Sequence, residues 1–238
     1  MAIENQEKIV AMFNEIAPTY DRANRVLSMG IDKTWRKKAC DLAYTLKGDK
    51  EVDLILDIAC GTGDMMDYWM KRASKQGVEV AKILGVDPSD GMVDVARVKF
   101  PKFDYAISKA TEIPVEDAQA DFLSISYGIR NVVEREEALK EFNRVLKPGG
   151  YVVILEFMKR ENPGIMAKMT DFYLNKVLPR IGGVISNNKE AYEYLPNSIE
   201  GFLTLEKMQE ELGETGFEVC YAKSFSMNIS SLIIARKK

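Results

Sequence analysis

Asp57-Ile58-Ala59-Cys60-Gly61-Thr62-Gly63-Asp64 follows a short apolar run and precedes an amphipathic stretch of helical length. A strand, a glycine-rich turn and a helix in this order are typical of the cofactor loop of a doubly wound α/β sheet. Gly61 and Gly63 let the backbone approach a ligand closely, because neither residue carries a Cβ atom. The stretch therefore predicts a ligand site at the carboxyl end of a parallel strand.

Short apolar runs alternate with helix-length intervals along the rest of the chain. Strands separated in this way form right-handed βαβ units, which build a mostly parallel sheet with helices on both faces. The sequence therefore predicts an α/β fold. The predicted strands cover residues 53–58, 81–86, 103–107, 122–126, 151–157, 217–223 and 229–236, and two of the predicted helices cover residues 132–147, stopped at Lys147-Pro148-Gly149-Gly150, and about 204–213.

Two segments do not follow this alternation within the single domain predicted for residues 1–238. Apolar residues recur at helical spacing from residue 5 to residue 47, with Pro18 and Gly30 as breaks, so residues 1–50 form a helical cap. Residues 163–200 are rich in Met, aromatic and Pro-Gly elements. We interpret them as a lid insertion over the site.

Composition limits the class of protein. With 46% hydrophobic and 29% charged residues, 238 residues can bury one core. A formal net charge of -3 provides no global field that would attract nucleic acid. We find no apolar amino-terminal signal and no run of eighteen apolar residues, and this favours a cytoplasmic protein.

The chain contains no histidine, which excludes histidine-based triads, histidine-ligated metals and the usual general base near neutral pH. Cys40, Cys60 and Cys220 are too few and too scattered for a disulfide framework or a zinc site. We therefore expect no metal, and we expect the chemistry to use carboxylates, Tyr, Cys, Lys or Arg.

The glycine loop is unsuited to a phosphate. A dinucleotide fingerprint needs a third glycine where this chain has Met66, and Asp64 stands where a pyrophosphate would need amide donors. S-adenosylmethionine has no phosphate and presents an ammonium, a carboxylate and a sulfonium, so carboxylates at Asp57 and Asp64 would favour it. Asp87 ends the next predicted strand, where it can accept hydrogen bonds from both ribose hydroxyls.

Other interpretations of these residues stay open. The two glycines could make only a tight turn, and Asp87 could merely cap a helix. Cys60 fits a small packing residue better than a nucleophile. At the level of function, the alternatives are an NAD-dependent oxidoreductase, a cofactor-binding protein without turnover, and a methyltransferase for another small aromatic or lipid acceptor.

The chain resembles the menaquinone and ubiquinone biosynthesis C-methyltransferases over nearly its whole length. Its glycine loop and Val145 to Gly150 are shared by many methyltransferases. The Tyr20-Asp21 preface, the Gly128-Ile129-Arg130-Asn131 loop and the segment from Tyr192 to Ile199 are far more particular to this family, and they lie within or overlap the other matching segments. Those segments are Phe13-Asn14-Glu15-Ile16-Ala17-Pro18-Thr19-Tyr20-Asp21, Asn24 with Leu27-Ser28-Met29-Gly30-Ile31-Asp32, Trp35-Arg36, Ile125-Ser126-Tyr127-Gly128-Ile129-Arg130-Asn131-Val132, Leu155-Glu156-Phe157, Leu178-Pro179-Arg180-Ile181-Gly182 and Tyr194-Leu195-Pro196-Asn197-Ser198-Ile199.

The resemblance implies a class I, Rossmann-like methyltransferase with seven strands. It implies C-methylation of a prenylated quinol by S-adenosylmethionine, from demethylmenaquinol to menaquinol and also on a ubiquinol precursor. It further implies peripheral contact with the inner face of a membrane, whereas association into a homo-oligomer stays open. The cofactor contacts that it implies, beside Asp57, Gly61, Gly63 and Asp64 of the loop, are Thr62, Asp87, Lys109 with Ala110 beside the adenine, and Ser126.

Two positions depart from the family pattern. Lys109 stands where the family commonly has Asp or Asn, and an ammonium cannot accept a hydrogen bond from the adenine amino group. Near the carboxyl end, Met227-Asn228-Ile229-Ser230-Ser231 replaces a glycine-rich turn and a histidine. We expect the adenine to be bound by backbone groups and the final hairpin to differ in shape.

Methylation of a ring carbon gains from an ionised ring oxygen, and a phenol titrates near pH 10. Arg130 holds its proton too tightly to act as a base, but it can stabilise that oxyanion. Asn131 can donate to a ring oxygen, and Tyr20 with Asp21 could orient water or relay the proton. The alternatives are a surface ion pair between Arg130 and Glu134, and a helix-start cap with a packed aromatic for Tyr20 and Asp21.

Overall fold

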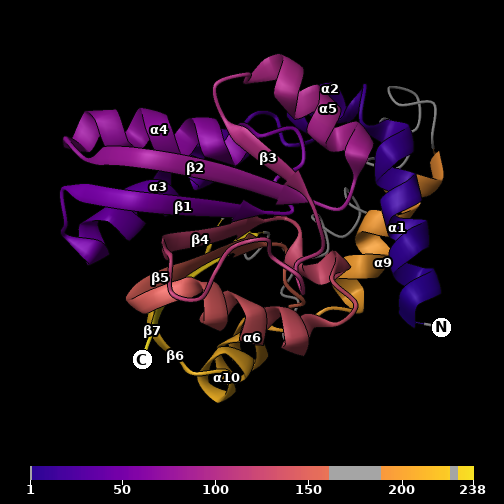
Figure 1. Cartoon of the computed structure of the whole chain (residues 1–238). Coiled ribbons are helices and arrows are strands. Elements are labelled where there is room, and N and C mark those ends of the chain that lie inside the picture. Colours follow the sequence, from indigo (N-terminus) through magenta and orange to yellow (C-terminus); the bar gives the residue numbers. More distant parts are fainter. Residues whose placement is uncertain (1, 161–188, 226–229) are drawn as a thin grey trace.

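The computed structural model describes residues 2–160, 189–225 and 230–238. Seven strands form one sheet in the order β3-β2-β1-β4-β5-β7-β6, with β7 antiparallel to both of its neighbours and the other pairs parallel (Figure 1). This arrangement confirms the predicted α/β class. The strands are β1 Glu51–Ile58, β2 Glu79–Asp87, β3 Asp104–Ile107, β4 Ala120–Ser126, β5 Leu146–Glu156, β6 Phe217–Phe225 and β7 Ser230–Lys237.

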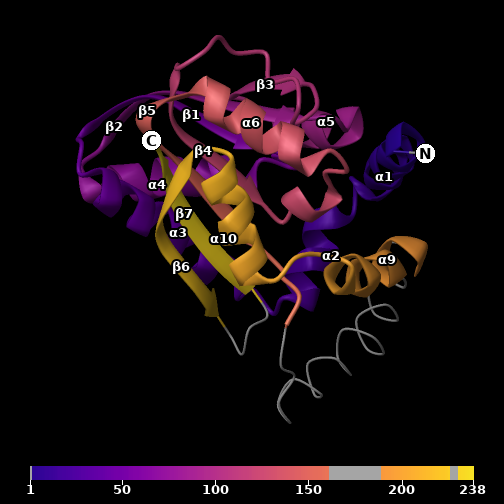
Figure 2. The same ribbon diagram turned by 90° about the horizontal axis from the view of Figure 1, so that it is seen from below.

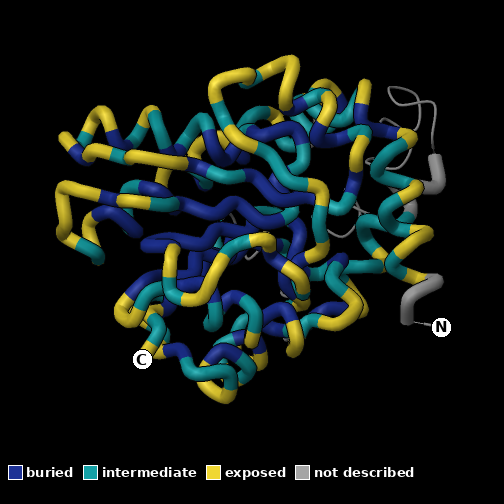
Figure 3. Tube along the Cα trace, in the orientation of Figure 1, coloured by how far each residue is buried: buried dark blue, intermediate teal, exposed yellow. Residues whose placement is uncertain are grey.

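Helices cover both faces of the sheet. α6 (Arg135–Val145) and α10 (Leu205–Glu214) bury their apolar residues in one cluster with the sheet, whereas α4 (Asp64–Gln76) packs on the other face. α5 (Asp90–Lys99) lies between β2 and β3 in the chain. The central strands are the most buried part of the molecule (Figure 3), as expected for strands with apolar contacts on both faces.

The helical cap consists of α1 (Ala2–Ile16), α2 (Tyr20–Leu27) and α3 (Asp32–Lys47). Gly30 allows the sharp turn between the last two, because its φ of +76° is left-handed. α3 packs beside α4, whereas α1 contacts α5 and α9 (Lys189–Glu200). α1 and α9 therefore lie together at the end of the sheet where the parallel strands finish (Figures 1 and 2).

A buried polar chain fixes the carboxyl end of β1. Tyr44 Oη donates to the backbone oxygen of Trp69, and Trp69 Nε1 donates to Ser124 Oγ at 2.9 Å. Ser124 Oγ then donates to Asp57 Oδ1 at 2.6 Å. Because Trp69 and Ser124 are fully buried, the core itself sets the position of the Asp57 carboxylate.

The predicted helix at 132–147 is wrong at both ends. Residues Ile129–Asn131 form a short 3₁₀ turn, and α6 then spans Arg135–Val145. β5 begins directly at Leu146, and residues 147–150 bulge opposite Asp121, since Leu146 pairs with Ala120 and Tyr151 with Phe122. Such a bulge depends on the neighbouring strand, which local sequence does not reveal.

Most of the predicted lid, residues 163–200, lies outside the described residues, and so does 226–229 of the divergent carboxyl-terminal turn. α9 is the part of the lid segment that is described. Within the described ranges, no helix is long and apolar enough to cross a membrane.

Candidate active site

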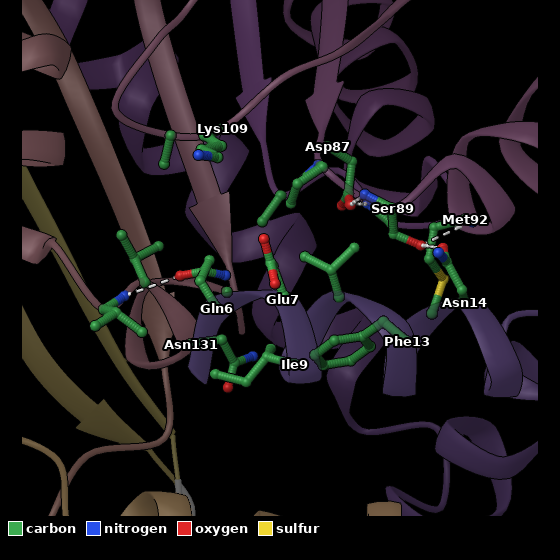
Figure 4. A pocket seen from close by; sticks show the side chains of 18 of the residues that line it. Gln6, Glu7, Ile9, Phe13, Asn14, Asp87, Ser89, Met92, Lys109 and Asn131 are labelled. Atoms are coloured by element: carbon green, nitrogen blue, oxygen red, sulfur yellow. Dashed lines mark hydrogen bonds between the residues drawn. The ribbon is translucent and has the colours of Figure 1, made fainter. Parts of the chain in front are cut away.

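A cavity of about 440 Å³ lies between α1 and the carboxyl ends of β1, β2 and β4 (Figure 4). Its volume falls within the usual range for small-ligand sites, about 300–1,000 Å³. Gly61 and Asp87 line one part of it, and Tyr20, Tyr127 and Asn131 line another. A ligand in this cavity would therefore touch both the glycine loop and the loop after β4.

The backbone of the glycine loop adopts conformations that require glycine. Gly61 and Gly63 have φ of +54° and +83°, which is the left-handed region that favours glycine. A Cβ atom on Gly63 would also lie 3.1 Å from the Phe100 ring and 3.3 Å from Tyr105 Oη. Substitution of Gly63 would thus disturb the start of α4 as well as the loop.

Asp87 is 6% exposed and lies on the cavity wall (Figure 4). Its carboxylate accepts hydrogen bonds from the backbone N–H groups of Gly61, at 2.8 Å, and Ser89, at 2.9 Å. Burial raises the pKa of Asp87 to about 6, against the effect of these two donors. A carboxylate has room for about four hydrogen bonds, so Asp87 can accept two more from a ligand.

Lys109 and Ala110 line the same cavity as Asp87 (Figure 4). Lys109 is exposed and Ala110 is buried. The structure therefore places this predicted adenine pair and the predicted ribose ligand on one continuous surface.

Two buried oxygens near the ends of β1 and β4 have no hydrogen-bond partner in the part of the chain that the structure describes. They are Asp57 Oδ2 and Ser126 Oγ. Burial raises the pKa of Asp57 to about 7, although Ser124 and the nearby Arg36 oppose the shift. Unpaired buried acceptors are rare in folded proteins, and they suit a ligand that brings its own donors.

A hydrogen bond and ion pairs connect Thr62, Asp21 and Asp64. None of these three residues lines the large cavity. Thr62 Oγ1 donates to Asp21 Oδ1 at 2.5 Å, and Lys99 Nζ bridges Asp21 and Asp64 at 2.5 and 2.6 Å. Arg25 also pairs with Asp64, at 3.3 Å. Burial acts to raise the pKa of Asp64, but Lys99 and the arginines outweigh it and lower that pKa. This cluster ties α2 to the glycine loop.

Tyr20 and Asn131 lie on the cavity wall. Burial raises the pKa of Tyr20, with Arg36 and Arg130 acting against the shift, so the phenol stays protonated at neutral pH. Asn131 is 8% exposed, and its Oδ1 accepts a hydrogen bond from Tyr194 Oη at 3.0 Å. Both residues can therefore donate to an oxygen atom of a ligand.

Arg130 lies behind the cavity wall rather than on it. Its guanidinium forms a buried ion pair with Glu156, donates from Nε to Ser198 Oγ at 3.1 Å and lies 5.5 Å from the Phe157 ring centroid. The partner is thus Glu156, which is fully buried, and not Glu134. Arg130 can influence a ligand mainly through its charge.

Sequence analysis assigned no polar role to α1, which closes one side of the cavity (Figure 4). Gln6 Oε1 accepts a hydrogen bond from Val133 N at 3.1 Å, and Asn14 Oδ1 accepts one from Gly91 N at 3.1 Å. Glu7 also lines the cavity. The polar contacts of α1 could not be predicted from local sequence, because they reach loops more than 70 residues away in the chain. The one signal in the sequence was that Asn14 lies in a segment that matches the family.

S-adenosylmethionine suits this set of groups. It lacks phosphates, and the loop that would meet a phosphate is flanked by Asp57 and Asp87. Its ribose could bind Asp87, its adenine could lie beside Lys109 and Ala110, and its charged end would supply partners for buried polar atoms.

The sequence comparisons all match methyltransferases. Residues 1–237 match the model of the ubiE/COQ5 methyltransferase family. The ubiquinone/menaquinone biosynthesis C-methyltransferase UbiE of Campylobacter jejuni subsp. jejuni serotype O:6 is 55% identical over 99% of this chain and 100% of its own length. The demethylmenaquinone methyltransferase of Chlorobaculum parvum is 38% identical over 98% of this chain and 94% of its own.

Solved structures support the fold. A SAM-dependent methyltransferase from Thermotoga maritima, described as a possible histamine N-methyltransferase, superposes with a TM-score of 0.60 at 19% identity, over 97% of this chain and 100% of that one. A SAM-dependent methyltransferase from Aquifex aeolicus gives a TM-score of 0.56 at 18% identity, over 84% and 89% of the two chains.

Proposed function

The chain belongs to the ubiE/COQ5 methyltransferase family, and we propose that it methylates a ring carbon of demethylmenaquinol to give menaquinol. It is an S-adenosylmethionine-dependent enzyme. One observation carries the proposal within the structure. A single cavity joins Gly61 and Asp87 to the hydrogen-bonding side chains of Tyr20 and Asn131.

When bound, S-adenosylmethionine supplies a methyl group on a positively charged sulfur. Asp87 would accept hydrogen bonds from the ribose hydroxyls, and the left-handed backbone at Gly61 would allow close approach to the cofactor. Lys109 leaves the adenine amino group without a side-chain acceptor at that position. Residues of α1 line one side of the cavity in which the ligands would bind.

Methyl transfer replaces a hydrogen on the ring carbon, and this hydrogen leaves as a proton to solvent water. The ring is nucleophilic when its hydroxyl has also lost its proton to water, which leaves an ionised ring oxygen. Tyr20 keeps its proton and can donate it in a hydrogen bond to that oxygen, and the amide of Asn131 can donate a second. Burial raises the pKa of Tyr20 and the positive charge of Arg130 opposes that rise, so Arg130 also favours negative charge nearby. Glu156 holds the Arg130 guanidinium in place.

The direct test is a transfer assay with methyl-labelled S-adenosylmethionine and chemically reduced demethylmenaquinol in detergent. We expect label in menaquinol and stoichiometric S-adenosylhomocysteine. The oxidised quinone should give no product, because it offers no ionisable ring hydroxyl. A benzoquinol precursor serves as the second acceptor. Turnover of that acceptor alone, or of neither, would contradict the proposal.

We also propose peripheral contact with a lipid surface, where such an acceptor resides. Three apolar side chains at the α2–α3 turn are exposed to solvent, with Met29 at 85%, Val26 at 48% and Ile31 at 43%. Met29→Asp should reduce co-flotation with lipid vesicles. Val98→Asp, at an equally exposed apolar position on α5, is the matched control and should leave co-flotation unchanged. Equal effects of both variants would argue against this surface.

A further inference from the structure

A second, smaller cavity of about 40 Å³ lies beneath the glycine loop. It shares Tyr20, Ala59, Gly61 and Ser126 with the large cavity, so the two adjoin. Its walls are mainly polar, whereas those of the large cavity are mainly apolar. A single ligand that has an apolar body and a short polar end would fit the pair of cavities.

Three residues on the wall of the small cavity each carry a buried polar atom that has no hydrogen-bond partner within residues 2–160, 189–225 and 230–238. These atoms are Arg36 Nε, Asp57 Oδ2 and Ser126 Oγ. One is a cationic donor, one belongs to an acidic group and one is a hydroxyl that can donate or accept. Buried polar groups are normally paired, so three unpaired ones on one small wall indicate a missing polar ligand.

The rest of each charged side chain is firmly held. Arg36 Nη1 donates to Asp32 Oδ2 at 2.7 Å, and the Arg36 guanidinium lies 5.1 Å from the Tyr127 ring centroid. Asp57 Oδ1 accepts the Ser124 hydroxyl at 2.6 Å. The unpaired atoms are therefore preorganised on side chains that are 87% or more buried, since Arg36 is 13% and Asp57 1% exposed.

We infer that Arg36 and Asp57 bind the amino-acid end of S-adenosylmethionine, with the Arg36 guanidinium on its carboxylate and Asp57 on its ammonium. The assignment rests on S-adenosylmethionine as the cofactor. Opposite charges on the two side chains match the zwitterion, and the adjoining large cavity takes the adenosine. An arginine is well suited to a carboxylate because its donors lie in one plane.

Asp64 would be the obvious alternative partner for the ammonium, since it lies in the same loop and lines the same small cavity. Its negative charge is already compensated by two cations, Lys99 at Oδ1 and Arg25 at Oδ2. Asp57 keeps one oxygen free. The geometry thus assigns the ammonium to Asp57 and leaves Asp64 to the ionic link between α2 and the loop.

The test is calorimetric titration with three probes that differ at the amino-acid end. S-adenosylhomocysteine has both charges, decarboxylated S-adenosylhomocysteine keeps only the ammonium, and 5′-methylthioadenosine has neither. Arg36→Gln should weaken S-adenosylhomocysteine binding roughly ten- to hundredfold, the scale for losing a charged hydrogen bond. Its effect on the other two probes should stay below about twofold.

Asp57→Asn should weaken both amine-bearing probes and spare 5′-methylthioadenosine. Arg36→Lys should recover part of the affinity, because it restores the charge without the planar donors. Lys33→Gln removes one positive charge from an exposed position of the same helix and is the matched control. A circular-dichroism melt of each variant shows whether it is folded.

Two outcomes would overturn the assignment. Arg36→Gln could weaken all three probes equally, which would show that Arg36 only supports the fold of the site. It could also leave S-adenosylhomocysteine binding unchanged, so that the carboxylate is bound elsewhere. Failure of the wild-type protein to bind any adenosyl probe would instead contradict its use of S-adenosylmethionine.

Discussion

Burial raises the pKa of the Tyr20 phenol, and Arg36 and Arg130 both lie close enough to oppose that rise, yet their guanidinium groups are held very differently. Arg130 is paired with Glu156 and also donates to Ser198. Arg36 is paired with Asp32 but keeps a buried Nε without a partner. The Arg130 guanidinium is thus held by partners within the protein, whereas the Arg36 guanidinium has one donor left for a ligand.

The largest effect should come from breaking the buried ion pair between Arg130 and Glu156. Glu156→Ala would leave the Arg130 charge buried without its counterion, and such losses cost about 3–5 kcal/mol. We expect a decrease of that size in the free energy of unfolding, measured by urea denaturation. Asp32→Ala should cost less, because the side chains of the Arg36–Asp32 pair are each 13% exposed, against 6% and 0% for Arg130 and Glu156. Equal losses for the two variants would remove the distinction between the pairs.

The second effect concerns chemistry at the acceptor side. Arg130→Ala should lower kcat about a hundredfold, the scale of losing one oxyanion-stabilising group, and leave S-adenosylhomocysteine affinity nearly unchanged. Lysine should rescue only part of the rate, and raising the pH toward the pKa of the acceptor phenol should narrow the gap to wild type.

Arg130→Ala also leaves the buried Glu156 carboxylate without its counterion. A charge-balanced variant is therefore needed as its control. Arg130→Met combined with Glu156→Gln removes both charges and should recover much of the lost stability. If kcat stays low in this folded double variant, Arg130 contributes to catalysis. A near-normal kcat would show that the pair is purely structural and that Asn131 and Tyr20 suffice.

The third effect tests the contact of Asp87 with the ribose. S-adenosylhomocysteine has the amino-acid end and 5′-methylthioadenosine lacks it, but both carry the ribose and should share this contact. Asp87→Ala should weaken S-adenosylhomocysteine and 5′-methylthioadenosine alike, by roughly 1.5–3 kcal/mol, the range for a charged hydrogen-bond partner. Calorimetric titration gives both values. Unchanged affinities in a folded variant would remove Asp87 from the site.

The smallest effect is a pH dependence of binding. Asp57 has a pKa raised to about 7 in the unliganded protein, mainly by burial. An ammonium binds the ionised form and lowers that pKa, so affinity for S-adenosylhomocysteine should rise with pH and level off above about 7. Below that pH the affinity should fall by at most tenfold per pH unit.

The matched probe for this dependence is 5′-methylthioadenosine, which carries no ammonium and should show no change around pH 7. Its affinity should fall only near and below pH 6, where Asp87 becomes protonated. Asp57→Asn should remove the dependence for S-adenosylhomocysteine around pH 7. Persistence of the same profile in that variant would assign the titration to another group.

Local sequence predicted the seven strands and the glycine loop, because apolar periodicity and left-handed glycines are properties of short segments. It misplaced the ends of α6, since the bulge after Leu146 depends on pairing with Ala120 and Phe122. It proposed Glu134 as an alternative partner of Arg130, whereas Glu156 lies 26 residues away in the chain. Contacts of that range are set by the topology of the sheet.

The candidate site shows the same limit. The strand-end residues Asp57 and Asp87 could be proposed because parallel strands end at one edge of a sheet, whereas Ser126 was implied by the family resemblance. Arg36 and the polar residues of α1 could not, since helix packing alone brings them to the loops. The resemblance marked Arg36 as part of a matching segment but gave it no role.

A crystal structure of the chain with S-adenosylhomocysteine tests the contrast between the two arginines most directly. We expect the ligand carboxylate within hydrogen-bond distance of Arg36, its ammonium on Asp57 and its ribose hydroxyls on Asp87, while Arg130 keeps its pair with Glu156. An amino-acid end that contacts Asp64 or Arg130 instead, with Arg36 Nε still unpaired, would contradict the account.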